Sequence, residues 1–94
     1  MPRTLNETSQ FRSDEKRIKR SGRFEWEQIR AVVKSLMNDR ALHERHRDHK
    51  LSGEYEGVRE CHVAPDWLLI DDKDSDDTLA ALTLIRTGSH SELS

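Results

Sequence analysis

The fold of this chain is decided by the stretch Arg59-Glu60-Cys61-His62-Val63-Ala64-Pro65-Asp66-Trp67-Leu68-Leu69-Ile70. Residues 58–63 alternate as a strand does, which puts Val58, Glu60 and His62 on one face. Residues 64–66 signal a turn, because the proline presets the backbone at the first corner. Residues 67–71 follow as a second strand, so the sequence predicts an antiparallel hairpin over 58–71.

Two helices are predicted before this hairpin. Residues 9–20 form a polar helix that ends at Ser21-Gly22, because glycine accepts the left-handed conformation of a helix cap. Residues 24–38 form the clearer helix, since five apolar residues share one stripe: Ile29, Val32, Val33, Leu36 and Met37. The two helices followed by strands indicate an α+β fold.

The remaining segments are predicted from short patterns. Residues 79–86 read as a third strand, the acidic residues 71–77 as a loop, and residues 90–94 as a tail. Residues 1–8 are compatible with an edge strand or with a loose segment.

Length and composition describe one small domain. The chain has 94 residues, of which 33% are hydrophobic and 36% are charged, so its core must be modest. A single cysteine, Cys61, excludes an internal disulfide and favours a reducing cytoplasm. The longest apolar run, residues 67–70, is far shorter than a membrane helix.

Charge is unevenly distributed along the chain. Residues 1–59 hold 14 Lys and Arg against 10 Asp and Glu, whereas residues 60–94 hold 2 against 8. The basic excess within residues 12–23 has two interpretations, a solvated helix face or a contact surface for nucleic acid. For the second interpretation the substrate-binding candidates are Lys16, Arg17, Lys19 and Arg20.

Five side chains in the second half of the chain suit metal-free acid–base chemistry on a phosphodiester: His49, His62, Asp66, Arg86 and His90. In RNA the ribose 2′-hydroxyl attacks the adjacent phosphorus when a base removes its proton and an acid protonates the leaving 5′-oxygen. Histidine serves in either role because its unperturbed pKa is about 6.5. Arginine supplies fixed donors to phosphate oxygens, and a carboxylate orients a histidine.

Each of these residues also has an ordinary structural interpretation. A histidine taken singly is usually a surface or hydrogen-bonded residue, Asp66 is a turn residue, and Arg86 is a partner in a surface ion pair. Trp67 is either a core residue or a platform on which a base stacks. The pattern, rather than a single residue, predicts a nuclease site.

Other kinds of site have weaker support. His43, His46 and His49 recur at every third position, but neither a pair of cysteines nor an HExxH motif accompanies them, so we expect no metal site and no cofactor. Cys61 and His62 are adjacent on a strand and point to opposite faces, which argues against a protease pair.

Five runs form a motif set by their order and spacing: Asp48-His49, Leu51-Ser52-Gly53, Arg59-Glu60-Cys61-His62, Pro65-Asp66-Trp67-Leu68-Leu69-Ile70 and Arg86-Thr87-Gly88-Ser89-His90-Ser91. This set resembles the YafQ branch of the RelE/ParE toxin superfamily. The N-terminal half resembles the family more loosely, with a basic helix, a Ser-Gly break and an amphipathic helix. The resemblance covers nearly the whole chain as one domain, residues 1–94.

The resemblance implies the toxin of a type II toxin–antitoxin system. Such toxins are cytoplasmic, ribosome-dependent endoribonucleases that cleave mRNA without a metal, and their fold is two helices packed on a small twisted antiparallel sheet. The partners implied are the ribosome, mRNA and a small DNA-binding antitoxin, for which the basic helix at residues 11–23 is a docking candidate. No membrane partner is implied.

The resemblance also implies roles for the site residues. His49 or His62 is the base, with Asp66 supporting His62, and Arg86 stabilises developing charge. His90 is the acid or binds phosphate. Trp67 shapes or supports the site and is a further substrate-binding candidate.

Two positions depart from the family pattern. Ser94 stands where the family usually has an aromatic residue, and Asp71-Asp72 follow Ile70 where the family usually has tyrosine. These departures leave an alternative open, namely a catalytically weakened or inactive protein of the same fold that acts by binding a partner or another target.

Overall fold

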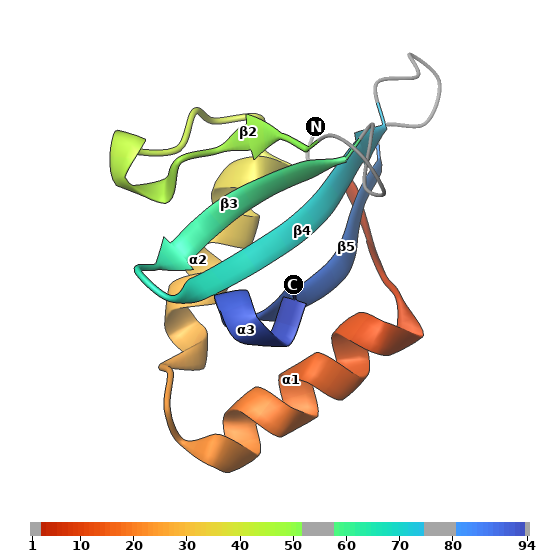
Figure 1. The fold of residues 1–94 in the computed structure, drawn as a ribbon. Helices are drawn as coiled ribbons and strands as arrows, with labels where there is room; N and C mark the ends of the chain where they lie inside the picture. The colour runs from red at the N-terminus through yellow and green to blue at the C-terminus, as the bar shows by residue number, and fades with distance from the viewer. Residues whose placement is uncertain (1–2, 52–57, 75–80, 94) are drawn as a thin grey trace.

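Five strands form one sheet in the order β1-β5-β4-β3-β2 (Figure 1). The computed structural model describes residues 3–51, 58–74 and 81–93. Its strands are β1 (Thr4–Glu7), β2 (His49–Lys50), β3 (Arg59–Ala64), β4 (Trp67–Asp74) and β5 (Ala81–Gly88). Its helices are α1 (Ser9–Ser21), α2 (Trp26–Met37), the 3₁₀ turn η1 (Glu44–His46) and α3 (His90–Leu93). The predicted α+β fold, with two N-terminal helices packed on a small sheet, is confirmed.

The sheet differs from the expected one at its edges. Strands β3, β4 and β5 are antiparallel neighbours as predicted. The short strand β2, which pairs antiparallel with β3, was not predicted, and β1 joins the far edge parallel to β5, from Thr4 opposite Ala81 to Glu7 opposite Leu84. Of the two readings of residues 1–8, the edge strand is confirmed for Thr4–Glu7, and the sheet is mixed.

The acidic loop predicted over residues 71–77 is wrong in its first part. β4 continues to Asp74 because residues 71–74 pair with residues 81–84 of β5. Residues 75–77 of that prediction lie outside the described residues, as do residues 79–80 of the predicted third strand. β5 itself extends to Gly88, and the expected tail begins with the short helix α3.

Helix α1 begins at a side-chain cap and ends at a glycine in the left-handed conformation. The Thr8 hydroxyl accepts a hydrogen bond from Phe11 N at 3.0 Å, which caps the first turn. Gly22 ends the helix with φ 67°, the left-handed cap that the sequence predicts. Phe11, Asp14 and Ile18 are the buried residues of this helix, so one carboxylate lies within its apolar stripe.

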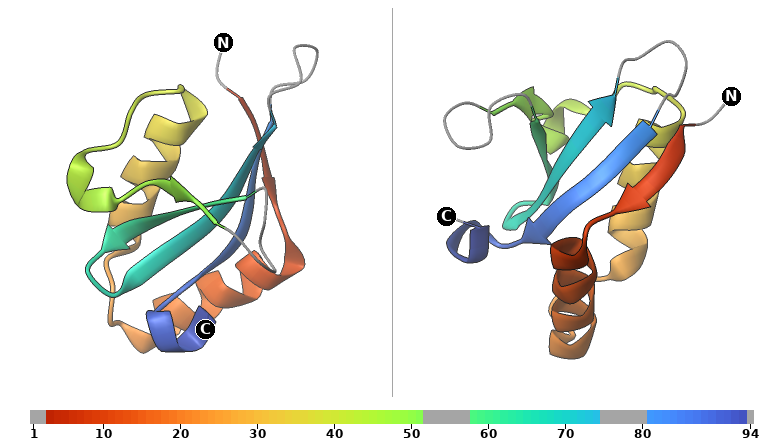
Figure 2. Two further views of the ribbon diagram at one scale, coloured as in Figure 1. Left: turned by 45° about the horizontal axis from the view of Figure 1, so that its top comes forward. Right: turned by 90° about the vertical axis from the view of Figure 1, so that its right-hand side faces the viewer.

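One hydrophobic core lies between the helices and the sheet. Its members come from α1, α2 and the strands: Phe11, Ile18, Ile29, Val32, Leu36, Cys61, Val63, Trp67, Leu69, Leu82 and Leu84. Helix α2 covers one face of the sheet, whereas α3 lies in front of the other face (Figures 1 and 2). This arrangement leaves the front face to carry the predicted site.

No helix within the described ranges has both the length and the apolar character that crossing a membrane requires.

Candidate active site

Strand register places the predicted site residues on one face of the sheet. His49 of β2 is opposite Glu60 of β3, Glu60 is opposite Ile70 of β4, and Ile70 is opposite Arg86 of β5. Directly opposed residues in antiparallel strands project to the same face. One row across four strands therefore carries a histidine at one end and an arginine at the other.

A second row runs beside the first and contains His62, which is opposite Leu68, which in turn is opposite Gly88. Leu68 and Ile70 are 4% and 1% exposed, yet neither belongs to the core cluster on the helix side. They form the apolar floor of the site.

Irregular pairing borders this floor on two strands. The register shifts between His62 and Ala64 in β3, and again where β4 passes from Ile70 to Asp71 against β5. Bulges bend a strand and redirect its side chains, and they are common beside active sites. His62 and Arg86 each adjoin one of these shifts.

His62 and His90 face each other with their ring centroids 5.3 Å apart. His62 comes from the end of β3 and His90 from the start of α3. Burial lowers the pKa of His62, and the nearby His90 lowers it further. His62 Nδ1 is buried and has no hydrogen-bond partner within the described residues. The lowered pKa favours the neutral form of His62, which is the form that can accept a proton.

Asp66 holds His90 and not His62. Asp66 Oδ1 accepts hydrogen bonds from His90 Nδ1 at 2.8 Å and from His90 N at 3.1 Å, and Arg23 donates to Oδ2 at 2.7 Å. The hydrogen bonds from His90 lower the pKa of Asp66 to about 2, so this carboxylate is ionised at physiological pH. The expectation that Asp66 supports His62 is corrected, because the β3–β4 turn points its carboxylate at the start of α3.

Glu60 is a site residue that the sequence analysis did not single out. Its Oε1 lies 3.5 Å from His49 Nε2, and its charge acts on His62 as well. The strand alternation that puts Glu60 on the same face as His62 was the available signal. His49 is therefore placed by Glu60, one row away from the His62–His90 pair.

Arg86 is clamped by a buried carboxylate on α1, another residue that sequence reasoning missed. Asp14 Oδ2 accepts from Arg86 Nε at 2.8 Å and Asp14 Oδ1 from Arg86 Nη2 at 3.2 Å. Asp14 also accepts from Arg17 Nη1 at 2.7 Å and from Thr87 N at 3.1 Å. Burial raises the pKa of Asp14, but these hydrogen bonds outweigh burial and leave the pKa below its usual value. The sequence signal for this contact was the position of Asp14 between Phe11 and Ile18 on the apolar stripe of the helix.

Of the roles expected for Trp67, support of the site fits the structure and contact with substrate does not, because its side chain is fully buried. It is 0% exposed and stacks on Phe24 with centroids 4.7 Å apart. Its Nε1 donates to Thr87 Oγ1 at 2.7 Å, and that hydroxyl donates to Leu68 O at 2.8 Å. Trp67 supports the strands beneath the site and is not available as a base platform.

The four basic candidates on α1 are only partly available to a substrate. Arg17 pairs with Asp14 and with Glu92 at 2.8 Å, and Lys19 pairs with Glu15 at 2.6 Å. Lys16 and Arg20 are exposed. Ser94, which replaces the family's aromatic residue, lies outside the described residues.

Comparison with known proteins identifies a family for this arrangement. Residues 3–94 match the model of the "bacterial toxin of type II toxin-antitoxin system, YafQ". The mRNA interferase toxin YafQ of Escherichia coli K12 is 42% identical over 48 residues, which are 51% of this chain and 48% of that protein. That alignment spans about half of each protein.

Solved structures match over the whole fold. E. coli YafQ superposes with a TM-score of 0.87, at 27% identity and 97% coverage of both chains. YafQ in the E. coli DinJ–YafQ toxin–antitoxin complex gives a TM-score of 0.86, at 28% identity, with 99% of this chain and 98% of that chain covered. A metal-bound toxin from Helicobacter pylori gives a TM-score of 0.85, at 34% identity over the full length of both. This chain therefore belongs to the YafQ family of bacterial type II toxin–antitoxin toxins.

Proposed function

We propose that this chain is an endoribonuclease that cleaves mRNA on the ribosome by attack of the 2′-hydroxyl, with histidines as base and acid and without a catalytic metal. The mRNA interferase activity named for the E. coli relative supports the substrate class. The observation that best supports this chemistry is the His62–His90 pair. Burial lowers the pKa of His62, whereas His90 is hydrogen-bonded to Asp66.

In the proposed reaction His62 takes the proton of the 2′-hydroxyl, and the 2′-oxygen forms a bond to phosphorus. The bond from phosphorus to the 5′-oxygen breaks, and His90 gives its Nε2 proton to that oxygen. Asp66 keeps the His90 ring in place by accepting from Nδ1. The products are a 2′,3′-cyclic phosphate and a 5′-hydroxyl, and the two histidines end with their protonation states exchanged.

Arg86 supplies the positive charge for the phosphorane-like transition state. Asp14 orients its guanidinium through two donors, so the group is held in one geometry before substrate arrives. Glu60 and His49 lie at the other end of the same row and position the ribose side of the substrate.

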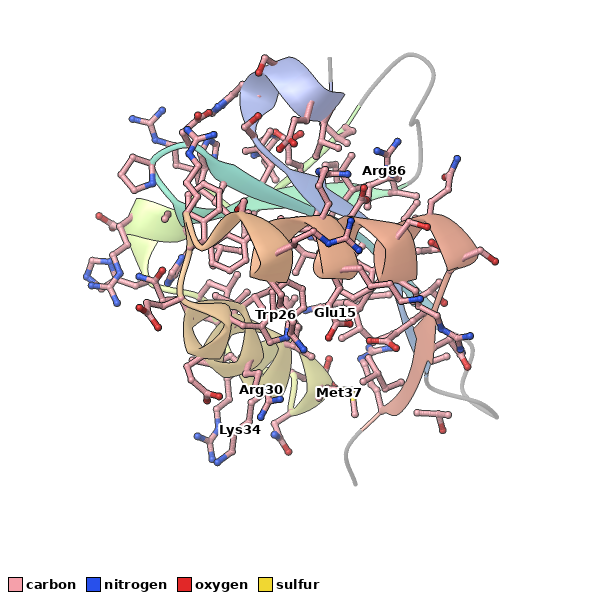
Figure 3. All side chains as sticks on the ribbon, turned by 90° about the horizontal axis from the view of Figure 1, so that it is seen from below. Glu15, Trp26, Arg30, Lys34, Met37 and Arg86 are labelled. Carbon is pink, nitrogen blue, oxygen red and sulfur yellow. The ribbon has the colours of Figure 1, made fainter. Side chains whose placement is uncertain are left out.

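The test is cleavage of a programmed ribosomal complex by purified toxin, with product ends analysed. His62→Ala and His90→Ala should each slow cleavage by about 10²–10⁴-fold, while Arg30→Gln, an exposed change on α2, should cleave normally. Figure 3 shows Arg30 on the opposite side of α1 from Arg86.

The product ends separate the mechanisms. A 2′-deoxy substitution at the cleaved nucleotide should abolish cleavage, and the products should carry 2′,3′-cyclic phosphate ends. A 3′-hydroxyl with a 5′-phosphate would instead indicate attack by water and would overturn the mechanism. An intact message with wild-type protein would favour the alternative of a binding protein that does not cut.

We also propose a cytoplasmic DNA-binding antitoxin as the regulatory partner. The DinJ–YafQ complex supports this partner class, because its toxin chain shares the fold of this one. Co-expression with the neighbouring reading frame, followed by purification through a tag on this chain, should yield a stable complex. Recovery of this chain alone would contradict the proposal.

A further inference from the structure

A cleft of about 950 Å³ opens at the His62–His90 pair, and apart from these two histidines its lining has no part in the chemistry proposed above. Helix α2 forms one wall with residues 28–35, and the loop 41–47 forms the other wall. The end of β3 and the turn that follows it close the cleft, which reaches His62 and His90. A volume of this size is at the upper end of ligand sites, which typically range from about 300 to 1,000 Å³.

The lining of the cleft is cationic although the chain as a whole is acidic. Arg45 and Arg47 line it together with four of the five histidines of the sequence, and none of its described lining residues is an aspartate or a glutamate. Within the parts of the chain that the structure describes, no carboxylate pairs with Arg45 or Arg47. By contrast, Arg17 and Lys19 of the basic helix α1 are paired with carboxylates.

The loop wall is built into the site by its own histidines. His43 Nδ1 accepts from Arg45 N at 3.1 Å, which caps η1. His46 Nδ1 donates to the carbonyl oxygen of His62 at 2.6 Å, and His49 Nδ1 donates to Arg47 O. These hydrogen bonds fix the loop wall to His62 and to His49. An RNA strand lying in the cleft therefore leads directly to the phosphate that reacts at the His62–His90 pair.

We infer that this cleft binds the single-stranded RNA that flanks the cleaved bond, with Arg45 and Arg47 contacting its phosphates. The inference rests on the proposed endoribonuclease function and moves the RNA contact from α1 to the loop 41–47. Small and apolar residues of α2, namely Ala31 and Val32, leave room for a nucleotide against the opposite wall. An anionic chain fits because the described lining offers it cations and no like charge.

The test is the affinity of a fluorescein-labelled 2′-O-methyl hexaribonucleotide, which cannot be cleaved, measured by fluorescence anisotropy from 50 mM to 1 M salt. Losing two phosphate contacts should lower the salt slope by about 1.4, since each contact on a single strand contributes about 0.7. When the salt concentration falls from 1 M to 50 mM, the affinity of Arg45→Gln/Arg47→Gln should therefore rise on the order of 50-fold less than that of wild type. Its thermal melt should match wild type, because both side chains are exposed.

The matched control is Arg12→Gln/Arg30→Gln, which removes the same charge from exposed positions on α1 and α2 outside the cleft. It should keep the wild-type slope. Equal slopes for the two double variants would overturn the inference. So would unchanged RNA affinity combined with weakened binding of the co-expressed antitoxin, which would assign the cleft to protein docking.

The two experiments distinguish a wrong assignment of the cleft from a wrong proposal for the nuclease function. If Arg45→Gln/Arg47→Gln binds RNA as well as wild type while His62→Ala abolishes cleavage, the cleft assignment fails and the nuclease stands. If wild type never cleaves but the slope falls as expected, the nuclease fails and the RNA cleft stands.

Discussion

Asp71 should make the stability of this protein fall as pH rises. The residue is 0% exposed on the core face of β4, and neither carboxylate oxygen has a hydrogen-bond partner within the described residues. Burial raises the pKa of Asp71 to about 7, and the charge of Asp48 contributes to the increase, although Lys73 and Arg59 oppose it. A rise of roughly three units from 3.8 corresponds to about 4 kcal/mol at 1.36 kcal/mol per unit.

The sign follows from which state binds the proton. Between about pH 4 and pH 7 the folded chain holds a proton on Asp71 that the unfolded chain has released. The free energy of unfolding therefore decreases with pH across that window, by up to about 1.4 kcal/mol per unit, and levels off above pH 7.

Asp71→Asn keeps the shape and cannot ionise. Its buried amide has a cost of its own, but that cost does not vary with pH. The stability difference between Asp71→Asn and wild type should therefore shift in favour of the variant by about 3 kcal/mol between pH 4.5 and pH 8. Urea unfolding followed by tryptophan fluorescence at several pH values measures this difference.

Asp72→Asn is the matched control, because Asp72 is the next residue of β4 and is exposed. Its difference from wild type should stay within about 0.5 kcal/mol, as is usual for surface substitutions. A constant difference between Asp71→Asn and wild type from pH 4.5 to pH 8 would refute the reasoning.

Three further predictions follow from other buried or charged contacts. Asp14→Ala should lower the free energy of unfolding by about 3–5 kcal/mol in urea, because it leaves the partly buried Arg86 without its carboxylate; retention of wild-type stability would contradict the clamp. Thr87→Val should cost about 1–3 kcal/mol, since the buried Trp67 N–H loses its acceptor, and Thr87→Ser, which keeps the hydroxyl, should restore most of the loss. Asp66→Asn should flatten the stability profile from pH 4 down to pH 2, because the lowered pKa of Asp66 makes wild type lose stability as the pH falls through that window; parallel profiles would show that the carboxylate is not engaged.

The hairpin and the helix boundary were predictable because local chemistry determines them. The Pro65-Asp66 turn between alternating strands and the left-handed Gly22 both lie where the sequence places them. The continuation of β4 through residues 71–74 was not predictable, because aspartate disfavours strands and only pairing with β5 overrides that preference.

The sequence indicated that some of the candidate residues would lie together but not which of them would pair. His62, Asp66 and His90 do come together, yet the bond from Asp66 to His90 depends on where the chain returns after β5, 24 residues later. The link from Asp14 to Arg86 spans 72 residues and depends on how α1 packs against the sheet. Such long-range contacts arise from tertiary packing, which alternation and spacing do not encode.

The clamp between Asp14 and Arg86 couples the orientation of Arg86 to the packing of helix α1. Every opening of α1, even a brief local one, removes both carboxylate contacts from Arg86, the side chain proposed to stabilise the transition state. The fraction of molecules in which Asp14 orients Arg86 thus depends on the local unfolding equilibrium of α1. Under the proposed mechanism, an inhibitor that displaced this helix would stop cleavage without occupying the RNA cleft.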